Sequence, residues 1–185
     1  IATAPHLRAA CNVGVGYNNI DVAACTKAGI AVTNTPDVLT ETTADLAWAL
    51  LMSVARRLPM AERWLREGQW GAWRYDLWLG TDVHDATLGI IGMGRIGQAV
   101  ARRAMGFGMK TIYHNRTRLA GEMEAKYQAS WVTKDTLLRE ADFVLLLLPY
   151  SSTVHHYIGE AELRLMKPTA HLVNVAPAVL WMMRH

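Results

Sequence analysis

Cysteine and long apolar runs are scarce in this sequence. The two cysteines, Cys11 and Cys25, have neither the number nor the spacing of a disulfide framework or a zinc site. We therefore expect a reducing compartment and, by default, the cytoplasm. The most apolar stretches, residues 46–55 and 143–149, are much shorter than the roughly 18 residues that a membrane-spanning helix needs, which predicts that nothing here spans a bilayer.

Charge of one sign is not in large excess. The chain has 19 lysines and arginines against 16 aspartates and glutamates, and the basic residues are dispersed apart from short pairs such as Arg56 and Arg57. No patch for a nucleic acid stands out. A start methionine is missing too, since the chain begins with Ile1, so we expect a piece of a longer protein whose natural N-terminus, with any targeting signal, is not in this sequence. With 185 residues, 51% of them apolar, it can bury the core of one domain and part of another.

A run of glycines stands where an apolar strand gives way to an alanine-rich helix. Gly92, Gly94 and Gly97 form the pattern G-x-G-x-x-G. In a dinucleotide-binding turn the first glycine permits a tight bend, the second lets the backbone approach a pyrophosphate, and the third lets helix pack on strand. A glycine-rich turn without a ligand is the alternative, but the flanking strand and helix favour phosphate binding. The residues expected at the phosphates are Gly92, Met93, Gly94, Arg95, Ile96 and Gly97.

Strands and helices then alternate along the chain. We expect strands at 88–91, 111–114, near 131, 143–148 and 171–175, and helices at 96–107, 121–127, up to 140 and 160–166. Continuous apolar strands between helices predict an α/β fold with a doubly wound parallel sheet of the Rossmann type. Earlier, a strand at 7–15, a helix at 20–27 and a strand at 30–33 form one further βαβ step.

A long helix and an irregular connection separate these two units. Capping side chains near Thr40 and the apolar positions 46, 50, 51, 54 and 58 predict a buried helix that ends before Pro59. Residues 64–82 carry four tryptophans among glycines and charges, which predicts a connection with aromatic anchors.

The strand at 111–114 is not followed by an acidic residue. An acid at this place hydrogen-bonds the ribose 2′-hydroxyl of NAD. Here Asn115, Arg116, Thr117 and Arg118 follow, and their two guanidinium groups suit a 2′-phosphate. We therefore predict NADP, with NAD possible. In the alternative interpretation the arginines only solvate a surface loop.

Three further groups of residues are candidates for a site. Pro149, and Val175 and Ala176 in the turn after the last strand, stand at carboxyl ends of parallel strands, where such sheets bind ligands, although Pro149 can equally just end its strand. His155 and His156 fit a solvated loop better than a catalytic role. The Asn12-Val-Gly-Val-Gly run can present backbone amides to a carboxylate, or be an ordinary turn.

Read together, these segments resemble the D-isomer-specific 2-hydroxyacid dehydrogenases. The likeness runs in order from about Leu7 to Ala176 and is carried by residues 13–21, 38–45, 89–97 and 166–176. Within the family the chain looks most like the glyoxylate/hydroxypyruvate reductases, because Trp70, Trp73 and the segment 77–80 match their tryptophan-containing connection.

The resemblance implies a reaction and a division of labour. NAD(P)H delivers a hydride to C2 of a 2-keto acid, a histidine protonates the oxygen, a glutamate supports the histidine, and an arginine holds the substrate. By match, the amides of Val15 and Gly16 bind the substrate carboxylate, and Trp78 reaches the active site of a homodimer partner. The resemblance also implies that residues 1–38 end a flavodoxin-like substrate domain, 39–86 form a helix and linker, and 87–176 form the NAD(P)-binding domain.

The catalytic groups of the family are missing from this chain. The arginine is expected where Pro177 stands, and the histidine and glutamate are expected beyond His185. Trp181, Met182 and Met183 have single codons, and one base out of frame these codons encode Asp-Asp, which fits the family's Val-Val-Asp-acid sequence. Restoring one base in codon 177 can give Arg-Gly-Gly-Val-Val-Asp-Asp, so we predict that residues 177–185 are an out-of-frame tail and that the fragment is inactive.

Other interpretations stay open at this stage. A dinucleotide-sensing corepressor on the same fold, a pseudogene product and a truly divergent tail are alternatives. The sequence does not choose between glyoxylate, hydroxypyruvate and 2-ketogluconate as the substrate.

Overall fold

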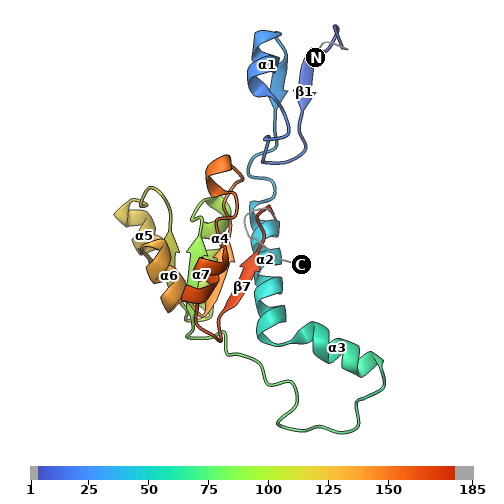
Figure 1. The fold of residues 1–185 in the computed structure, drawn as a ribbon, viewed down its shortest axis with the longest axis vertical. Coiled ribbons are helices and arrows are strands. Elements are labelled where there is room, and N and C mark those ends of the chain that lie inside the picture. The colour runs from blue at the N-terminus through green and yellow to red at the C-terminus, as the bar shows by residue number, and fades with distance from the viewer. Residues whose placement is uncertain (1–3, 178–185) are drawn as a thin grey trace.

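The computed structural model describes residues 4–177 and contains two parallel sheets (Figure 1). The larger sheet has the strand order β5-β4-β3-β6-β7. Its strands are β3 (Thr87–Ile91), β4 (Lys110–His114), β5 (Ala129–Trp131), β6 (Phe143–Leu146) and β7 (His171–Asn174). The direction of winding reverses between β3 and β6, which is where doubly wound sheets bind ligands. The fold class expected from the sequence is confirmed.

Helices cover both faces of the larger sheet. The connecting helices are α4 (Arg95–Gly106), α5 (Gly121–Tyr127), α6 (Lys134–Glu140) and α7 (Glu160–Leu165), with a 3-10 turn, η1, at Ser152–Val154. Alternate residues of one strand enter different cores: Leu88 and Ile90 pack with α4, whereas Ile91 packs with α6. Burial on both faces explains why these strands are apolar at every position.

A smaller unit at the N-terminal end stands apart from the larger sheet (Figure 1). It consists of β1 (Ala9–Cys11), α1 (Val22–Lys27) and β2 (Ala31–Thr33), and the two strands pair in parallel. The Asp21 carboxylate caps α1 by accepting a hydrogen bond from the Ala24 amide at 2.9 Å. The first strand is shorter than the range 7–15 expected from its apolar residues, because only three residues pair with β2.

Helix α2 (Thr40–Ala55) lies between the two units, and its buried face differs from the expected one. The face that packs on α4 is made of small residues together with Trp48 and Leu51. Leu46, Leu50 and Val54, which were expected in the core, are 53%, 40% and 39% exposed. The threonine cap expected from the sequence does not form either, since the helix begins after Leu39 and no side chain among the described residues caps it there.

Pro59 begins a helix instead of ending one. The chain breaks at Arg57, whose φ of 53° is left-handed, and α3 (Leu58–Arg66) starts directly afterwards. Proline is tolerated there because the first turn of a helix needs no amide donor. Trp64, expected in the connection, therefore lies in α3, and the irregular segment that returns to β3 spans residues 67–86 (Figure 1).

Candidate dinucleotide-binding site

The three glycines after β3 have different surroundings. Gly92 has a φ of +106°, and a Cβ there would lie 2.8 Å from the carbonyl carbon of Leu147. A Cβ at Gly97 would lie 2.5 Å from the Gly92 carbonyl oxygen. A Cβ at Gly94, in contrast, would meet no described atom within 4 Å. The first and third glycines are thus required by the protein backbone, and the second borders open space.

The N-terminus of α4 offers unpaired amides beside this open space. The first hydrogen bond of the helix runs from the Gln98 amide to the Gly94 carbonyl at 2.9 Å. The amides of Arg95, Ile96 and Gly97 therefore have no carbonyl within the helix, and no side chain of residues 4–177 caps the helix at Gly94. Free amides and the positive end of the helix dipole suit a pyrophosphate. The residues present thus fit a dinucleotide.

Met93 plays a different part in the loop. Its side chain is 1% exposed, and its amide donates to the Asn115 side-chain oxygen at 2.7 Å. Asn115 in turn accepts a hydrogen bond at its carbonyl from the Trp131 indole at 3.0 Å. Met93 and Asn115 therefore fix the two loops against each other, and any direct contact of either residue with a cofactor stays a prediction.

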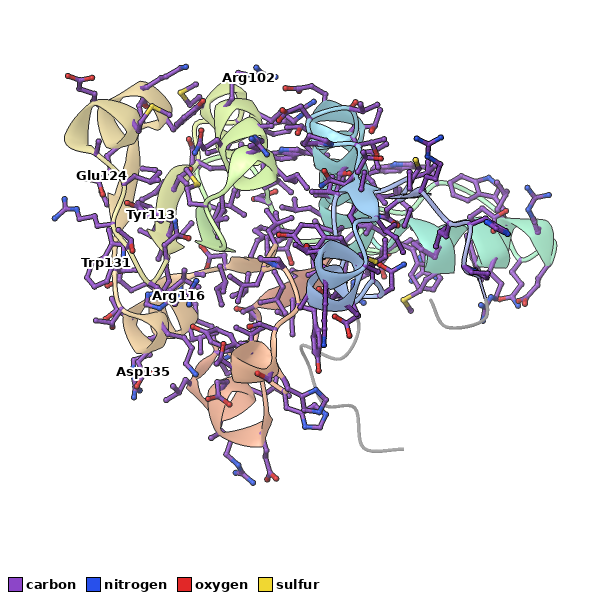
Figure 2. The ribbon with its side chains drawn as sticks, turned by 90° about the horizontal axis from the view of Figure 1, so that it is seen from above. Arg102, Tyr113, Arg116, Glu124, Trp131 and Asp135 are labelled. Carbon is purple, nitrogen blue, oxygen red and sulfur yellow. The ribbon has the colours of Figure 1, made fainter. Side chains whose placement is uncertain are left out.

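Of the two arginines after β4, one is held by the protein. Arg118 donates two hydrogen bonds to Glu124, at 2.9 and 2.7 Å, and the Tyr113 hydroxyl donates to the same carboxylate at 2.7 Å. Figure 2 shows Tyr113, Glu124 and Trp131 on the same side of the molecule. These donors lower the pKa of Glu124 to about 2. Arg118 is therefore anchored as part of a network.

Arg116 and Thr117 are exposed on the same loop. Within residues 4–177, neither side chain forms a hydrogen bond or an ion pair. Of the two guanidinium groups expected at a 2′-phosphate, Arg116 is thus the one without a competing carboxylate.

Pro149, Val175 and Ala176 follow strands that end at the same edge as the glycine loop. The Leu147 amide donates to Ile91 at 2.9 Å, and the Val175 amide donates to Leu146 at 3.3 Å. The Ala176 amide donates to the Asn174 side chain at 2.9 Å. The three residues thus follow the ends of β6 and β7 on the edge of the sheet where the glycine loop lies, and their contact with a cofactor stays a prediction. Pro177 is the last described residue, and the expected out-of-frame segment from Ala178 onward lies outside the described residues.

The two histidines after β6 are exposed, as expected for a solvated loop. The rings of His155 and His156 lie 4.0 Å apart, and His155 Nδ1 is 3.5 Å from the Tyr150 hydroxyl. Over residues 4–177, no group of three histidine, cysteine or acidic side chains is placed to hold a metal. No helix in that range is long and apolar enough to cross a membrane.

Sequence reasoning missed residues in the segment that joins the two units. Asn34 donates a side-chain hydrogen bond to the carbonyl of Val15 at 3.0 Å. Asp37 pairs with Arg95 of the glycine loop at 2.7 Å, and its φ of 70° is left-handed. Both contacts join residues far apart in the chain, and no periodicity marks them. The run Asn-Thr-Pro-Asp before a helix is the only local signal.

Trp78 lies beside α3 rather than beside the glycine loop. Its ring packs edge-on against Trp64 with centroids 6.0 Å apart, and the two line a hollow of about 330 Å³ with Met60. The indole N–H is buried without an acceptor among the described residues. Its reach into the active site of a partner stays a prediction.

This geometry agrees with a known family. The sequence profile of the D-isomer specific 2-hydroxyacid dehydrogenase NAD binding domain matches residues 48–181. The chain belongs to this family. The resemblance inferred from the motifs is thereby confirmed.

One curated member of the 2-hydroxyacid dehydrogenase family, the glyoxylate reductase of Thermococcus gammatolerans, is 54% identical over 177 residues. The match covers 94% of this chain and 53% of that protein. The chain thus spans about half the length of the curated relatives it matches.

Two solved structures of similar fold contain different cofactors. D-lactate dehydrogenase from Aquifex aeolicus, in complex with NAD and lactic acid, has a TM-score of 0.85 at 29% identity and covers 97% of this chain and 53% of its own. An acyclic imino acid reductase in complex with NADPH and D-Arg has a TM-score of 0.84 at 30% identity and covers 95% and 55%. The chain therefore carries a domain for a nicotinamide dinucleotide.

Proposed function

We propose that the full-length protein reduces a small 2-keto acid of the glyoxylate or hydroxypyruvate type to the 2-hydroxy acid, with NADPH as the reductant. The observation that carries the proposal is the glycine loop with free amides at the switch point of a 2-hydroxyacid dehydrogenase domain. The glyoxylate reductase relatives support the substrate class and favour an enzyme over a corepressor.

Each group of residues has a proposed task. The backbone of residues 92–97 holds the pyrophosphate, residues 115–118 hold the adenosine end, and Pro149, Val175 and Ala176 border the cofactor. The amides of Val15 and Gly16 hold the substrate carboxylate. When bound, the reduced nicotinamide supplies a hydride. In this proposal residues 1–38 belong to the substrate domain, 39–86 to the linker and 87–176 to the cofactor domain.

NADP is proposed over NAD because a free arginine follows β4 where an acid would favour NAD. We predict that Arg116→Ala raises the Kd for NADPH roughly 10-fold to 100-fold, as expected for a lost charge-assisted contact, and changes the Kd for NADH about 2-fold at most. Nicotinamide fluorescence titration of the full-length protein measures both constants. Arg164→Ala on α7, which removes an exposed arginine paired with Glu160, is the control. Equal losses for both cofactors would contradict the assignment.

The tail is proposed to result from one lost base at codon 177. Pro177 then stands in place of the arginine that holds the substrate, and the chain as written turns over negligibly. Sequencing the DNA through this codon and on both sides of it tests the idea. A reading frame with no base missing relative to a close intact relative would disprove it.

The experiment for the activity uses the complete reading frame with that base restored. We expect it to oxidise NADPH in the presence of glyoxylate or hydroxypyruvate, and the chain 1–185 to do so negligibly. Oxidation of NADPH by neither substrate, in protein that binds NADPH, would disprove the proposed reaction and leave a sensing role.

The homodimer is proposed from the exposed apolar residues of α2, α3 and the segment 67–86.

A further inference from the structure

In the loop between β1 and α1, the carbonyls of three successive residues accept hydrogen bonds from asparagine side chains. Asn12 donates from its side-chain amide to the Gly14 carbonyl at 3.2 Å and to the Gly16 carbonyl at 2.8 Å. Asn34, which follows β2, donates to the intervening Val15 carbonyl at 3.0 Å. Three successive carbonyls are therefore taken up by two asparagines, one on each strand of the small sheet.

This arrangement dictates where the neighbouring amides point. In a trans peptide unit the C=O and the following N–H point in opposite directions. Because the carbonyls of Gly14, Val15 and Gly16 face the asparagines, the N–H groups of Val15, Gly16 and Tyr17 face the other way. Within residues 4–177, none of these three amides has an acceptor. Val15 and Tyr17 are exposed, so the amides border solvent.

We propose that Asn12 and Asn34 are the positioning residues of the substrate-carboxylate site. They touch no substrate themselves. By fixing three carbonyls they align three successive amides into one concave donor set, which is the geometry in which backbone amides bind an anion. The proposal rests on the proposed reduction of a 2-keto acid, and it adds the amide of Tyr17 to those of Val15 and Gly16.

Asn34 also belongs to the segment that reaches the cofactor side of the molecule. Three residues further on, Asp37 pairs with Arg95 in the glycine loop. The Thr35 amide additionally donates to the Gly14 carbonyl at 3.1 Å. The segment 34–37 thus contacts the loop 14–17 through Asn34 and Thr35, and the phosphate-binding loop through Asp37. We infer that Asn34 in this way fixes the amides of residues 15–17 relative to the larger unit.

The test measures KM for glyoxylate, KM for NADPH, kcat and Tm in the full-length protein with the restored frame. Asn34→Ala and Asn12→Ala are expected to raise the KM for glyoxylate roughly 10-fold, the effect of losing one well-aligned hydrogen bond to a charged group. The KM for NADPH and the kcat are expected to stay within about 2-fold. Asn34→Gln, which retains an amide donor, should recover part of the loss.

Two further variants complete the test. Asn19→Ala is the matched control, because Asn19 is exposed in the same loop and its side chain forms no hydrogen bond with any residue in the described range. Asn34→Asp keeps the shape of the side chain but cannot donate to Val15, so it should raise the KM for glyoxylate at least as much as Asn34→Ala. It serves as the readout if Asn34→Ala does not fold.

The possible results separate the two proposals. An active wild type whose asparagine variants keep the wild-type KM for glyoxylate, or lose Tm and kcat with KM unchanged, overturns the positioning role and leaves the reaction standing. A wild type that binds NADPH but reduces no 2-keto acid overturns the reaction itself. A rise in KM for glyoxylate confined to the Asn12 and Asn34 variants supports the positioning role.

Discussion

At the scale of single residues, the three glycines of the loop after β3 have different roles. Gly92 needs its left-handed φ and lies against the backbone of Leu147, whereas Gly97 lies against the carbonyl of Gly92. Both are fixed by contacts within the protein. Gly94 has extended backbone angles that alanine also adopts, and it has open space beside it. Of the three glycines, Gly94 is therefore the one at which a substitution can test ligand binding without disturbing the fold.

We predict that Gly94→Ala raises the Kd for NADPH at least about 10-fold, because the added methyl group occupies the space where backbone and pyrophosphate approach each other. Its Tm should stay within about 2 °C of wild type. The Gly97→Ala variant should instead have a free energy of unfolding that is lower by roughly 1–3 kcal/mol, because the added Cβ pushes α4 away from the end of β3. Gly106→Ala, at an open position of the same helix, is the control. A Gly94→Ala variant with unchanged NADPH affinity would contradict the proposed site.

The spacing of the glycines predicted these environments because a tight turn followed by a helix is a local event. The hydrogen bond of Met93 with Asn115 and the ion pair of Arg118 with Glu124 were not predictable in this way. The first joins the loops after β3 and β4, whose approach depends on the register of these strands, and the second depends on how the loop after β4 folds back on α5. The residue types show which groups can form hydrogen bonds or ion pairs, but the tertiary structure determines which of these groups lie close enough to form them.

At the scale of elements, α2 illustrates the limit of a periodic pattern. Its apolar residues cover more than one face, so periodicity identified a helix but not the side that packs on α4. The structure buries alanines there, because small side chains let α2 approach the alanines of α4 closely. Of the leucines of α2 that were expected in the core, Leu51 is buried, whereas Leu46 and Leu50 are exposed.

In its ion pair with Arg95, at the start of α4, the Asp37 carboxylate would compete with the cofactor phosphates for this arginine. We predict that Asp37→Asn lowers the Kd for NADPH by up to about 5-fold, the range of an exposed ion pair, because Arg95 becomes free to turn to the phosphates. Asparagine also tolerates the left-handed φ of this position, so the fold should be preserved. Asp45→Asn, which removes the pair of α2 with Arg103 further along α4, is the control. Weaker NADPH binding by Asp37→Asn would refute the competition.

His171 joins β7 to the segment that precedes β3. Its ring stacks on Phe143 with centroids 5.2 Å apart, and its Nε2 lies 3.2 Å from the Thr81 hydroxyl. Burial, and secondarily the charge of Arg57, lowers the pKa of His171. The folded state therefore binds this proton less readily than the unfolded chain, so stability falls as the pH drops below about 6.5 and levels off under the folded pKa.

We predict that His171→Gln flattens the fall in Tm between pH 7.5 and pH 5.5. His84→Gln should act in the opposite direction, because Asp85 and Asp82 raise the pKa of His84 and its contribution is present below about pH 6.5. Thermal unfolding of both variants across this range measures the two slopes. An unchanged slope for His171→Gln would show that other groups dominate the acid sensitivity.

At the scale of the whole molecule, alternation of strands and helices was enough to predict two parallel units joined by a long helix. The orientation of the connection was not predictable, because α3 and the first part of the segment 67–86 extend away from both sheets (Figure 1), whereas Thr81 and Val83 contact the larger unit again. Their aromatic residues Trp70, Trp73 and Tyr75 are exposed. Within residues 4–177, the segment is held mainly at Trp78, which packs on Trp64, and at Thr81 and Val83, which contact the larger unit.

We expect the exposed apolar residues of this region to contact a second copy of the chain. Leu46, Leu50 and Val54 of α2 are continuous in sequence with Leu58, Met60 and Leu65 of α3, and all are at least 39% exposed. Exposed apolar patches mark association surfaces, and we predict that these residues contribute to one. We predict that the full-length protein has twice its monomer mass in light scattering at about 10 µM, and that the double variant Leu46→Glu, Leu50→Glu is monomeric, because charges in an apolar interface cost several kcal/mol. Both side chains are exposed in the single chain, so the variant should still fold.

Leu163→Glu, at an exposed leucine of α7 on the other face of the sheet, should leave the dimer intact. A wild type of monomer mass, or a double variant that stays dimeric, would place the interface elsewhere or remove it.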